Sequence, residues 1–228
     1  MRSVIKPLAM TLLLTAACTA YGAGGGEMPS RPMGGSTPTA TPEDQALSSY
    51  NSGVRDVEKA DELAADAARQ GDASRQAKVL GKAKDKYSSA LKKFTHATSL
   101  NPSMYQAWNY VGYTNRRLGN YEDALTAYDH ALRLKPDYAE AIEYRGHAYL
   151  GLNRLSEAKD AYLALFSGNR KLAAQLLTAM QGWVGDHRNN PAGVEAPAVE
   201  AFASWVSERS AIASQTASLT REGASAAW

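Results

Sequence analysis

Four histidines are the side chains of this sequence with the widest chemical repertoire, because imidazole serves as a general acid, a general base or a metal ligand near neutral pH. His96 and His130 are separated by 34 positions, and other pairs of similar residues in the chain have the same separation. A repeated structural unit explains that interval, and both side chains are expected to face outward. His147 and His187 have no metal ligand or triad partner at a recognisable spacing. The histidines therefore do not define a catalytic site.

Other catalytic motifs are also missing from the sequence. It contains no HExxH metal motif, no GxSxG nucleophile elbow, no phosphate-binding loop and no CxxC pair. Acidic pairs such as Glu122 and Asp123 are typical of the first turn of a helix, where they face the positive end of the helix dipole. We therefore predict a protein that is not an enzyme, with no catalytic residues, no cofactor and no metal.

Length and composition set the class of protein. The 228 residues suit one domain of ordinary size, and 44% hydrophobic with 21% charged residues is typical of a helical globular protein. A net charge of +2 is too small to indicate nucleic acid or an anionic surface as the main partner. We therefore predict no nucleic-acid partner.

A period of about 34 residues runs through the middle of the chain and predicts the elements that would position any site. Small and aromatic residues recur at that spacing in three series: Ala90, Ala124 and Ala158; Phe94, Tyr128 and Tyr162; Ala97, Ala131 and Leu165. Small residues let two helices approach closely, and an aromatic in each second helix fills the space between successive helical hairpins. The expected role of these residues is therefore packing.

The clearest unit of the repeat is the segment 105–136. Its key positions are Trp108, Val111, Gly112, Ala124, Tyr128, Ala131 and Pro136, with a turn at Gly119-Asn120 between two helical patterns. This set resembles the tetratricopeptide repeat (TPR) family. The resemblance implies an all-α solenoid of about three hairpins, in which each hairpin covers the apolar stripe of the next.

The repeat predicts the domain layout. Residues 103–170 form two regular repeats, residues 171–218 form capping helices, and 219–228 form a disordered tail. Residues 43–102 form an elongated first hairpin, because the interval from Gly53 to Ala90 is much longer than the matching interval from Gly112 to Ala124. Two interpretations of the extra length remain open: an insertion without a role, or an additional partner-binding arm.

The N-terminus predicts export. Residues 1–23 combine a basic start at Arg2 and Lys6 with a short apolar run, which is the pattern of an export signal. The segment that ends at Cys18 resembles a bacterial lipobox, with Thr15 where Leu or Val is usual. That resemblance implies lipidation of Cys18 and anchoring to the outer membrane. Cleavage after Ala20 or Ala23 is the alternative. Residues 24–42, rich in Gly and Pro, are expected to form a flexible linker.

The resemblance also implies a binding surface. In TPR proteins the first helix of each repeat lines a concave groove, and the matching positions here are Tyr50, Val54, Gln106, Asn109, Tyr113, Arg116, Glu140, Glu143 and His147. Such polar and aromatic side chains on a rigid support suit an extended peptide or a helix. A solvated face without a ligand is the alternative for each residue. Arg116 and Arg117 would contact an acidic segment weakly.

These observations together predict a function. We expect a non-catalytic interaction scaffold or adaptor of the bacterial cell envelope, located in the periplasm, that binds a protein or peptide partner. Its only contact with a membrane would be the lipid on Cys18. Two alternatives stay open: an envelope hydrolase with an unrecognised active site, and a self-assembling structural element. The sequence leaves the oligomeric state open.

Overall fold

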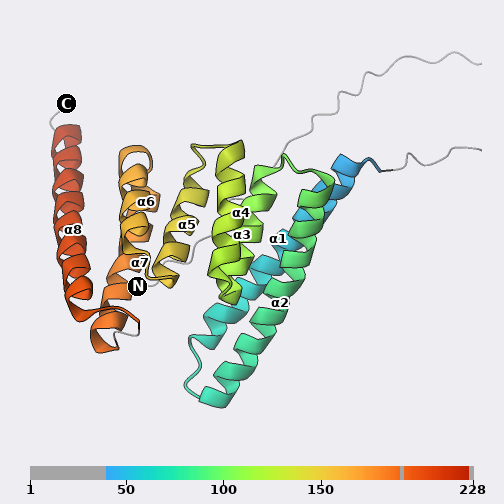
Figure 1. Ribbon diagram of the computed structural model, residues 1–228, viewed down its shortest axis with the longest axis horizontal. Helices are drawn as coiled ribbons and strands as arrows, with labels where there is room; N and C mark the ends of the chain where they lie inside the picture. Colours follow the sequence, from blue (N-terminus) through green and yellow to red (C-terminus); the bar gives the residue numbers. More distant parts are fainter. Residues whose placement is uncertain (1–39, 191–192, 226–228) are drawn as a thin grey trace, which may run out of the picture. The chain divides into compact units, whose positions relative to one another are not determined.

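A computed structural model of the chain describes residues 40–190 and 193–225, with side chains described to residue 216 (Figure 1). Throughout these ranges the regular structure is helical. Its helices lie in one compact unit, Pro42–Trp228. The predicted export signal, Cys18 and most of the predicted linker lie outside the described residues. No helix in the described ranges has both the length and the apolar character needed to cross a membrane.

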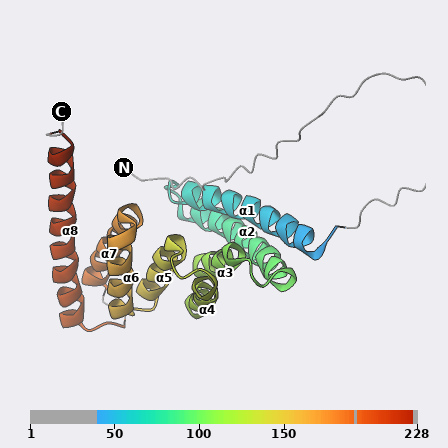
Figure 2. The same ribbon diagram turned by 90° about the horizontal axis from the view of Figure 1, so that it is seen from above.

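Eight helices make up the described part of the chain. They are α1 (Pro42–Ala67), α2 (Ala73–Leu100), α3 (Tyr105–Leu118), α4 (Tyr121–Leu134), α5 (Ala139–Gly151), α6 (Leu155–Gly168), α7 (Arg170–Asn189) and α8 (Ala196–Ser225). They pack as the hairpins α1–α2, α3–α4 and α5–α6, and each hairpin contacts the next. From α1 and α2 at one end, the helices follow one another to α8 at the other (Figures 1 and 2). The predicted all-α solenoid is confirmed.

The first helices of the hairpins form one layer. Helix α3 contacts α5, and α5 contacts α7, although a second helix separates each pair along the chain. The side chains on this layer are therefore brought side by side from segments far apart in the sequence. This layer carries the residues that the repeat predicts to form a binding surface.

The small and aromatic residues of the repeat form the contacts within this stack. Ala124 and Tyr128 are fully buried. A Cβ atom on Gly112 would lie 2.5 Å from the Tyr128 ring, and one on Gly53 would lie 2.7 Å from the Phe94 ring. These glycines therefore allow the ring of the second helix to rest directly on the backbone of the first. The packing role predicted for these positions agrees with their burial.

The first hairpin is about twice as long as the others. Helices α1 and α2 have 26 and 28 residues, whereas α3 and α4 have 14 each. Residues 68–72 form the bend, and Asp72 caps α2 by accepting a hydrogen bond from the backbone N–H of Arg75 at 2.7 Å. The bend end projects past α3 and α4 (Figure 1). Asp56 holds the two helices together through Lys86, Ser89 and Lys93.

The C-terminal helices cover the end of the repeat array. Met180, Trp183 and Phe202 pack in the same core cluster as Tyr162. Helix α7 continues through Gly185 to Asn189. Helix α8 continues to Ser225, although the cap was expected to end at 218 and 219–228 to be disordered. Residues 211–225 are rich in Ala, Ser and Thr and contain no proline. Because alanine has the strongest helix propensity, this segment continues the helix.

Candidate functional site

The residues predicted to form a binding surface occupy the first helices α1, α3 and α5. Six of the nine are half-buried: Tyr50, Val54, Gln106, Tyr113, Arg116 and His147. Glu140 is exposed. Because α3 and α5 are in contact, the α3 and α5 members form a continuous surface, which we call the first-helix surface.

Two of the nine predicted residues are not open to a partner. Asn109 and Glu143 are each only 2% exposed. They occupy corresponding positions on α3 and α5, one repeat period apart. Helical spacing alone places them on the predicted face, but both side chains are buried in the folded chain. We therefore correct the prediction for these two residues, which pack inside the layer.

Asp61 organises the part of the surface where α1 meets α3. Its carboxylate accepts a hydrogen bond from the Tyr113 hydroxyl at 2.8 Å and another from the Tyr87 hydroxyl. Arg117 lies 3.6 Å from the same carboxylate. Burial raises the pKa of Tyr113 well above its usual value, with a further contribution from the negative charge of Asp61. Tyr113 therefore stays a neutral hydrogen-bond donor.

Arg116 is a charged group of this surface that is surrounded by aromatic rings. Its guanidinium lies 5.2 Å from the ring centre of Tyr113 and 5.6 Å from that of Tyr144. Its Nε is buried without a hydrogen-bond partner, and it forms no ion pair within the described residues. Burial would lower the pKa of Arg116, but Tyr128, Tyr113 and the negative charge of Glu143 outweigh that effect and raise it, with a hydrogen bond to Tyr128 contributing. Arg116 is thus a fixed cation whose Nε has no partner.

Arg116 opens into a hollow of about 540 Å³ between the first helices α3, α5 and α7. His147 from α5 and Trp183, Asp186 and His187 from α7 line it, together with Asn153 from the turn after α5. The hollow therefore gathers one cation, Arg116, one carboxylate, Asp186, ring faces and hydrogen-bonding groups from α3, α5 and α7. This combination suits the side chains of a protein segment better than it suits any catalytic arrangement that the residues offer.

The two histidines of the hollow are held by their own helices. The Nε2 of His147 lies 2.7 Å from the Oε1 of Glu143, four residues earlier on α5. The sequence interpretation missed this partner, although a spacing of four residues places two side chains on one helix face. His187 stacks on Trp183 with ring centres 3.8 Å apart, and its Nδ1 lies 2.9 Å from the Trp183 carbonyl oxygen.

Sequence reasoning missed two tyrosines, Tyr110 and Tyr144, that lie in a row with the predicted Tyr50 and Tyr113. The rings of Tyr50, Tyr110, Tyr113 and Tyr144 are in successive contact, with centres 5.7, 6.2 and 5.2 Å apart in a row that runs from α1 to α5. Burial raises the pKa of Tyr110 and of Tyr144, so both stay neutral. Tyr110 and Tyr144 are separated by one repeat period. The repeat period was therefore the signal that could have identified them.

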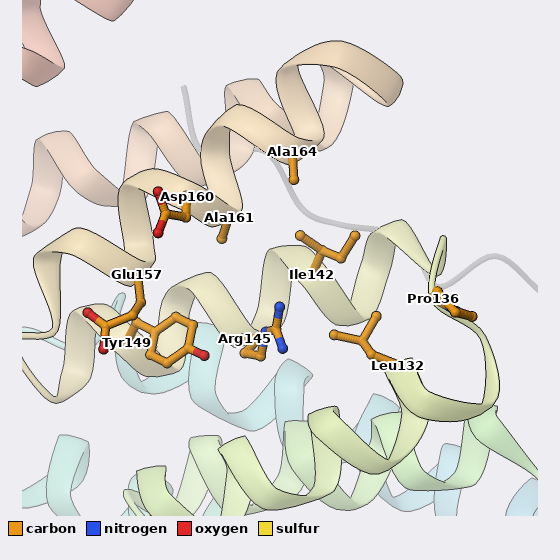
Figure 3. Close-up of a pocket in the computed structure, with 9 residues that line it drawn as sticks. All are labelled: Leu132, Pro136, Ile142, Arg145, Tyr149, Glu157, Asp160, Ala161 and Ala164. Carbon is orange, nitrogen blue, oxygen red and sulfur yellow. The ribbon is translucent and has the colours of Figure 1, made fainter.

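A second pocket, of about 440 Å³, lies between α4, α5 and α6 (Figure 3). Leu132 and Ile142 supply apolar walls, and Glu157 on α6 lies near Tyr149 on α5 (Figure 3). Its cation, Arg145, already pairs with Asp129 at 2.7 Å. This pocket therefore offers a partner no unpaired cation within the described residues, and its unpaired charge is the carboxylate of Asp160. For an acidic partner segment the first-helix hollow, which contains Arg116, is the better candidate site.

Metal binding has no support in this geometry. Across residues 40–190 and 193–225, no three His, Cys, Asp or Glu side chains are grouped closely enough to hold a metal ion. The prediction that the protein is not an enzyme stays a prediction.

Comparison with solved structures finds similar helical proteins at low identity. The first TPR of Spaghetti (RPAP3), bound to the HSP90 peptide SRMEEVD, is 19% identical over 63% of this chain and 96% of that chain, with a TM-score of 0.47. The second TPR domain of the human RPAP3 protein, in complex with the HSP70 peptide SGPTIEEVD, is 21% identical over 60% and 95%, with a TM-score of 0.45. The MamA RS-1 ArsTM double mutant is 19% identical over 72% and 94%, with a TM-score of 0.39.

Sequence comparisons identify one segment of the chain. No curated protein matches the sequence. Residues 112–153, which run from α3 through α4 and α5 into the following turn, match the sequence model of the family described as TPR repeat.

Proposed function

We propose that this protein is a non-catalytic interaction scaffold of the bacterial cell envelope, whose first-helix surface holds a segment of a partner protein. The observation that carries the proposal is the hollow of about 540 Å³ lined from α3, α5 and α7. A scaffold needs a rigid surface with polar and aromatic groups at fixed positions, and the stacked first helices supply one.

The chemistry of the hollow indicates which kind of segment it accepts. Arg116 is held between two tyrosine rings and forms no ion pair in the described part of the chain. A carboxylate from a partner would satisfy the guanidinium, because hydrogen bonds between ionised groups are stronger than those between neutral groups. The rings of Tyr121 and Trp183, which line the hollow, offer contact area with few rotatable bonds. We therefore propose a partner segment with an acidic side chain.

A photo-crosslinking experiment tests the location of the site. A benzophenone amino acid is placed at Gln106 or Glu140 on the first-helix surface, and at Thr126 or Leu163 on exposed positions of the second helices α4 and α6. We expect the same envelope protein to be crosslinked from positions 106 and 140 and not from 126 or 163. Crosslinks confined to the second helices, or none from any position, would overturn the proposal.

The envelope location is proposed from the sequence, with Cys18 as the lipidated residue. The support is the combination of a basic start, an apolar run and a lipobox-like ending in residues 1–18. Labelling with a radioactive fatty acid, followed by membrane fractionation, tests it. We expect the label and the membrane association to be lost together in Cys18→Ser. Absence of label from the unaltered chain would rule out lipidation.

A further inference from the structure

Helix α2 has a charge that the small net charge of the chain conceals. It carries seven Lys and Arg residues and one Asp, a net charge of +6. The whole chain has a net charge of +2, so the remainder carries −4. The positive charge of the protein is therefore concentrated on one helix of the elongated hairpin.

Five of the seven cations form a row along one flank of α2. They are Arg75, Lys78, Lys82, Lys86 and Lys93, spaced by three, four, four and seven residues. At 1.5 Å per residue the row is about 27 Å long, and these spacings return to the same side of a helix. The buried residues Ala83, Tyr87 and Phe94 point to a neighbouring side.

The row divides into a paired part and an unpaired part. Lys86 and Lys93 lie 3.1 and 2.6 Å from the Asp56 carboxylate on α1. Arg75, Lys78 and Lys82 are exposed, and within the described ranges their charged groups form no ion pair. Lysines four residues apart, such as Lys78 and Lys82, destabilise a helix by repulsion. An external anion would remove that repulsion.

The unpaired cations lie on the part of the hairpin that projects beyond the solenoid. The core cluster that the hairpin shares with α3 includes Leu63, Ala64 and Ala83. Arg75, Lys78 and Lys82 precede Ala83 on α2 and therefore lie toward the bend, the end that projects past α3 and α4 (Figure 1). The row is not part of either pocket described above. A straight exposed row of cations can meet a flat anionic surface.

We propose that Arg75, Lys78 and Lys82, at the projecting end of the elongated hairpin, form a docking surface for the anionic headgroups of a lipid bilayer. Clusters of Lys and Arg are attracted to anionic membranes, and the attraction grows with each cation near the surface. Helix α1, beside the row in the same hairpin, carries seven Asp and Glu residues and two Lys and Arg residues, a net charge of −5. The flank of α2 that carries the row, and not the whole hairpin, would therefore face the headgroups.

Vesicle co-sedimentation tests this proposal, with the full chain carrying Cys18→Ser so that no acyl group contributes. The vesicles are phosphatidylcholine alone, or phosphatidylcholine with about 30% phosphatidylglycerol. The test variant is Arg75→Glu/Lys78→Glu/Lys82→Glu. The control is Arg55→Glu/Arg133→Glu/Lys171→Glu, which makes the same change of net charge at exposed positions on three other helices. Circular dichroism melting shows whether both variants fold.

We expect binding to the anionic vesicles alone, weakened at high salt, and weakened roughly a hundredfold by the test variant but much less by the control. Equal losses in both variants would show that only the net charge matters and would overturn the proposal. Variant-sensitive binding to heparin without binding to vesicles would overturn it in favour of an acidic polymer. Each result is independent of what the first-helix surface binds.

Discussion

The Tyr113 hydroxyl on α3 lies 2.8 Å from each carboxylate oxygen of Asp61 on α1. The same carboxylate accepts a hydrogen bond from Tyr87 on α2 and pairs with Arg117 at 3.6 Å. One acidic side chain thus connects both helices of the elongated hairpin to the first helix of the next hairpin. The long hairpin is therefore fixed to the solenoid by polar contacts as well as by apolar packing.

Tyr113→Phe removes the hydrogen bond from α3 to Asp61 and leaves the Arg117 ion pair in place, while it keeps the ring in its contacts with Tyr87 and Tyr144. We expect a loss of about 1 kcal/mol in the free energy of unfolding, because Asp61 is partly exposed and water can replace the donor. Urea denaturation measures the loss. Tyr149→Phe, at a half-buried tyrosine without a hydrogen bond in the described structure, is the control and should be nearly neutral. Equal stability of both variants would show that the bond contributes nothing.

Asp56 makes the stability of the elongated hairpin depend on pH. Burial would raise the pKa of this carboxyl, but hydrogen bonds from Lys93, Ser89 and Lys86 outweigh that effect and lower it to about 2. A folded-state pKa below the unfolded value means that the contribution is complete above about pH 4 and lost as the pH falls to about 2. We expect about 2 kcal/mol of the free energy of unfolding to disappear over that range.

The measurement is urea denaturation at several pH values between about 2 and 5. Asp56→Asn should be less stable than the unaltered chain at neutral pH and should lack this part of the pH dependence. Asp137→Asn, at an exposed position, is the control and should keep it. If Asp56→Asn shows the same decline in acid as the unaltered chain, other carboxyl groups cause the decline.

The repeat spacing was sufficient to predict the stacked hairpins. Ala124 and Tyr128 are buried because each must face the neighbouring helix, and that requirement is visible in the sequence as the repeat period. The greater length of the first hairpin could be predicted in the same way, from the number of residues between Gly53 and Ala90 in the sequence. Because the hairpins pack in a repeating way, the buried small and aromatic residues recur at the repeat period. This part of the fold can therefore be predicted from a single sequence.

The details of the candidate site were less predictable. Helical spacing placed Asn109 and Glu143 on the binding face, but the depth of burial depends on how closely α3 approaches α5. The unpaired Nε of Arg116 is likewise a property of the surroundings, which come from two hairpins. The basic row on α2 was present in the sequence, but its significance depends on which cations Asp56 neutralises.

Gly112→Ala tests the close approach at the repeat signature. The new Cβ atom would lie 2.5 Å from the Tyr128 ring, which is fully buried and has no space to move. We expect a loss of about 1–3 kcal/mol in the free energy of unfolding from overpacking. Gly185→Ala on α7 is the matched control, because nothing lies within 4 Å of its added Cβ. It should stabilise the protein by about 0.5–1 kcal/mol. Similar effects at both glycines would contradict the close contact.

Asn153 lines the hollow, adopts a left-handed backbone conformation and accepts a hydrogen bond from Trp183, which also lines the hollow. It has a positive φ of 58° in the turn after α5, and its Oδ1 accepts a hydrogen bond from the Trp183 indole at 3.1 Å. Asn153→Gly loses the hydrogen bond but tolerates the backbone, whereas Asn153→Ala loses the bond and adds strain of about 1 kcal/mol.

Urea denaturation of the two Asn153 variants separates these contributions. We expect Asn153→Gly to lower the free energy of unfolding by about 1 kcal/mol, and Asn153→Ala to lower it by about 2 kcal/mol. The difference between the variants measures the backbone requirement, and the glycine value measures the hydrogen bond to Trp183. Equal losses would mean that the turn imposes no strain, and a neutral glycine variant would mean that the indole is satisfied without Asn153.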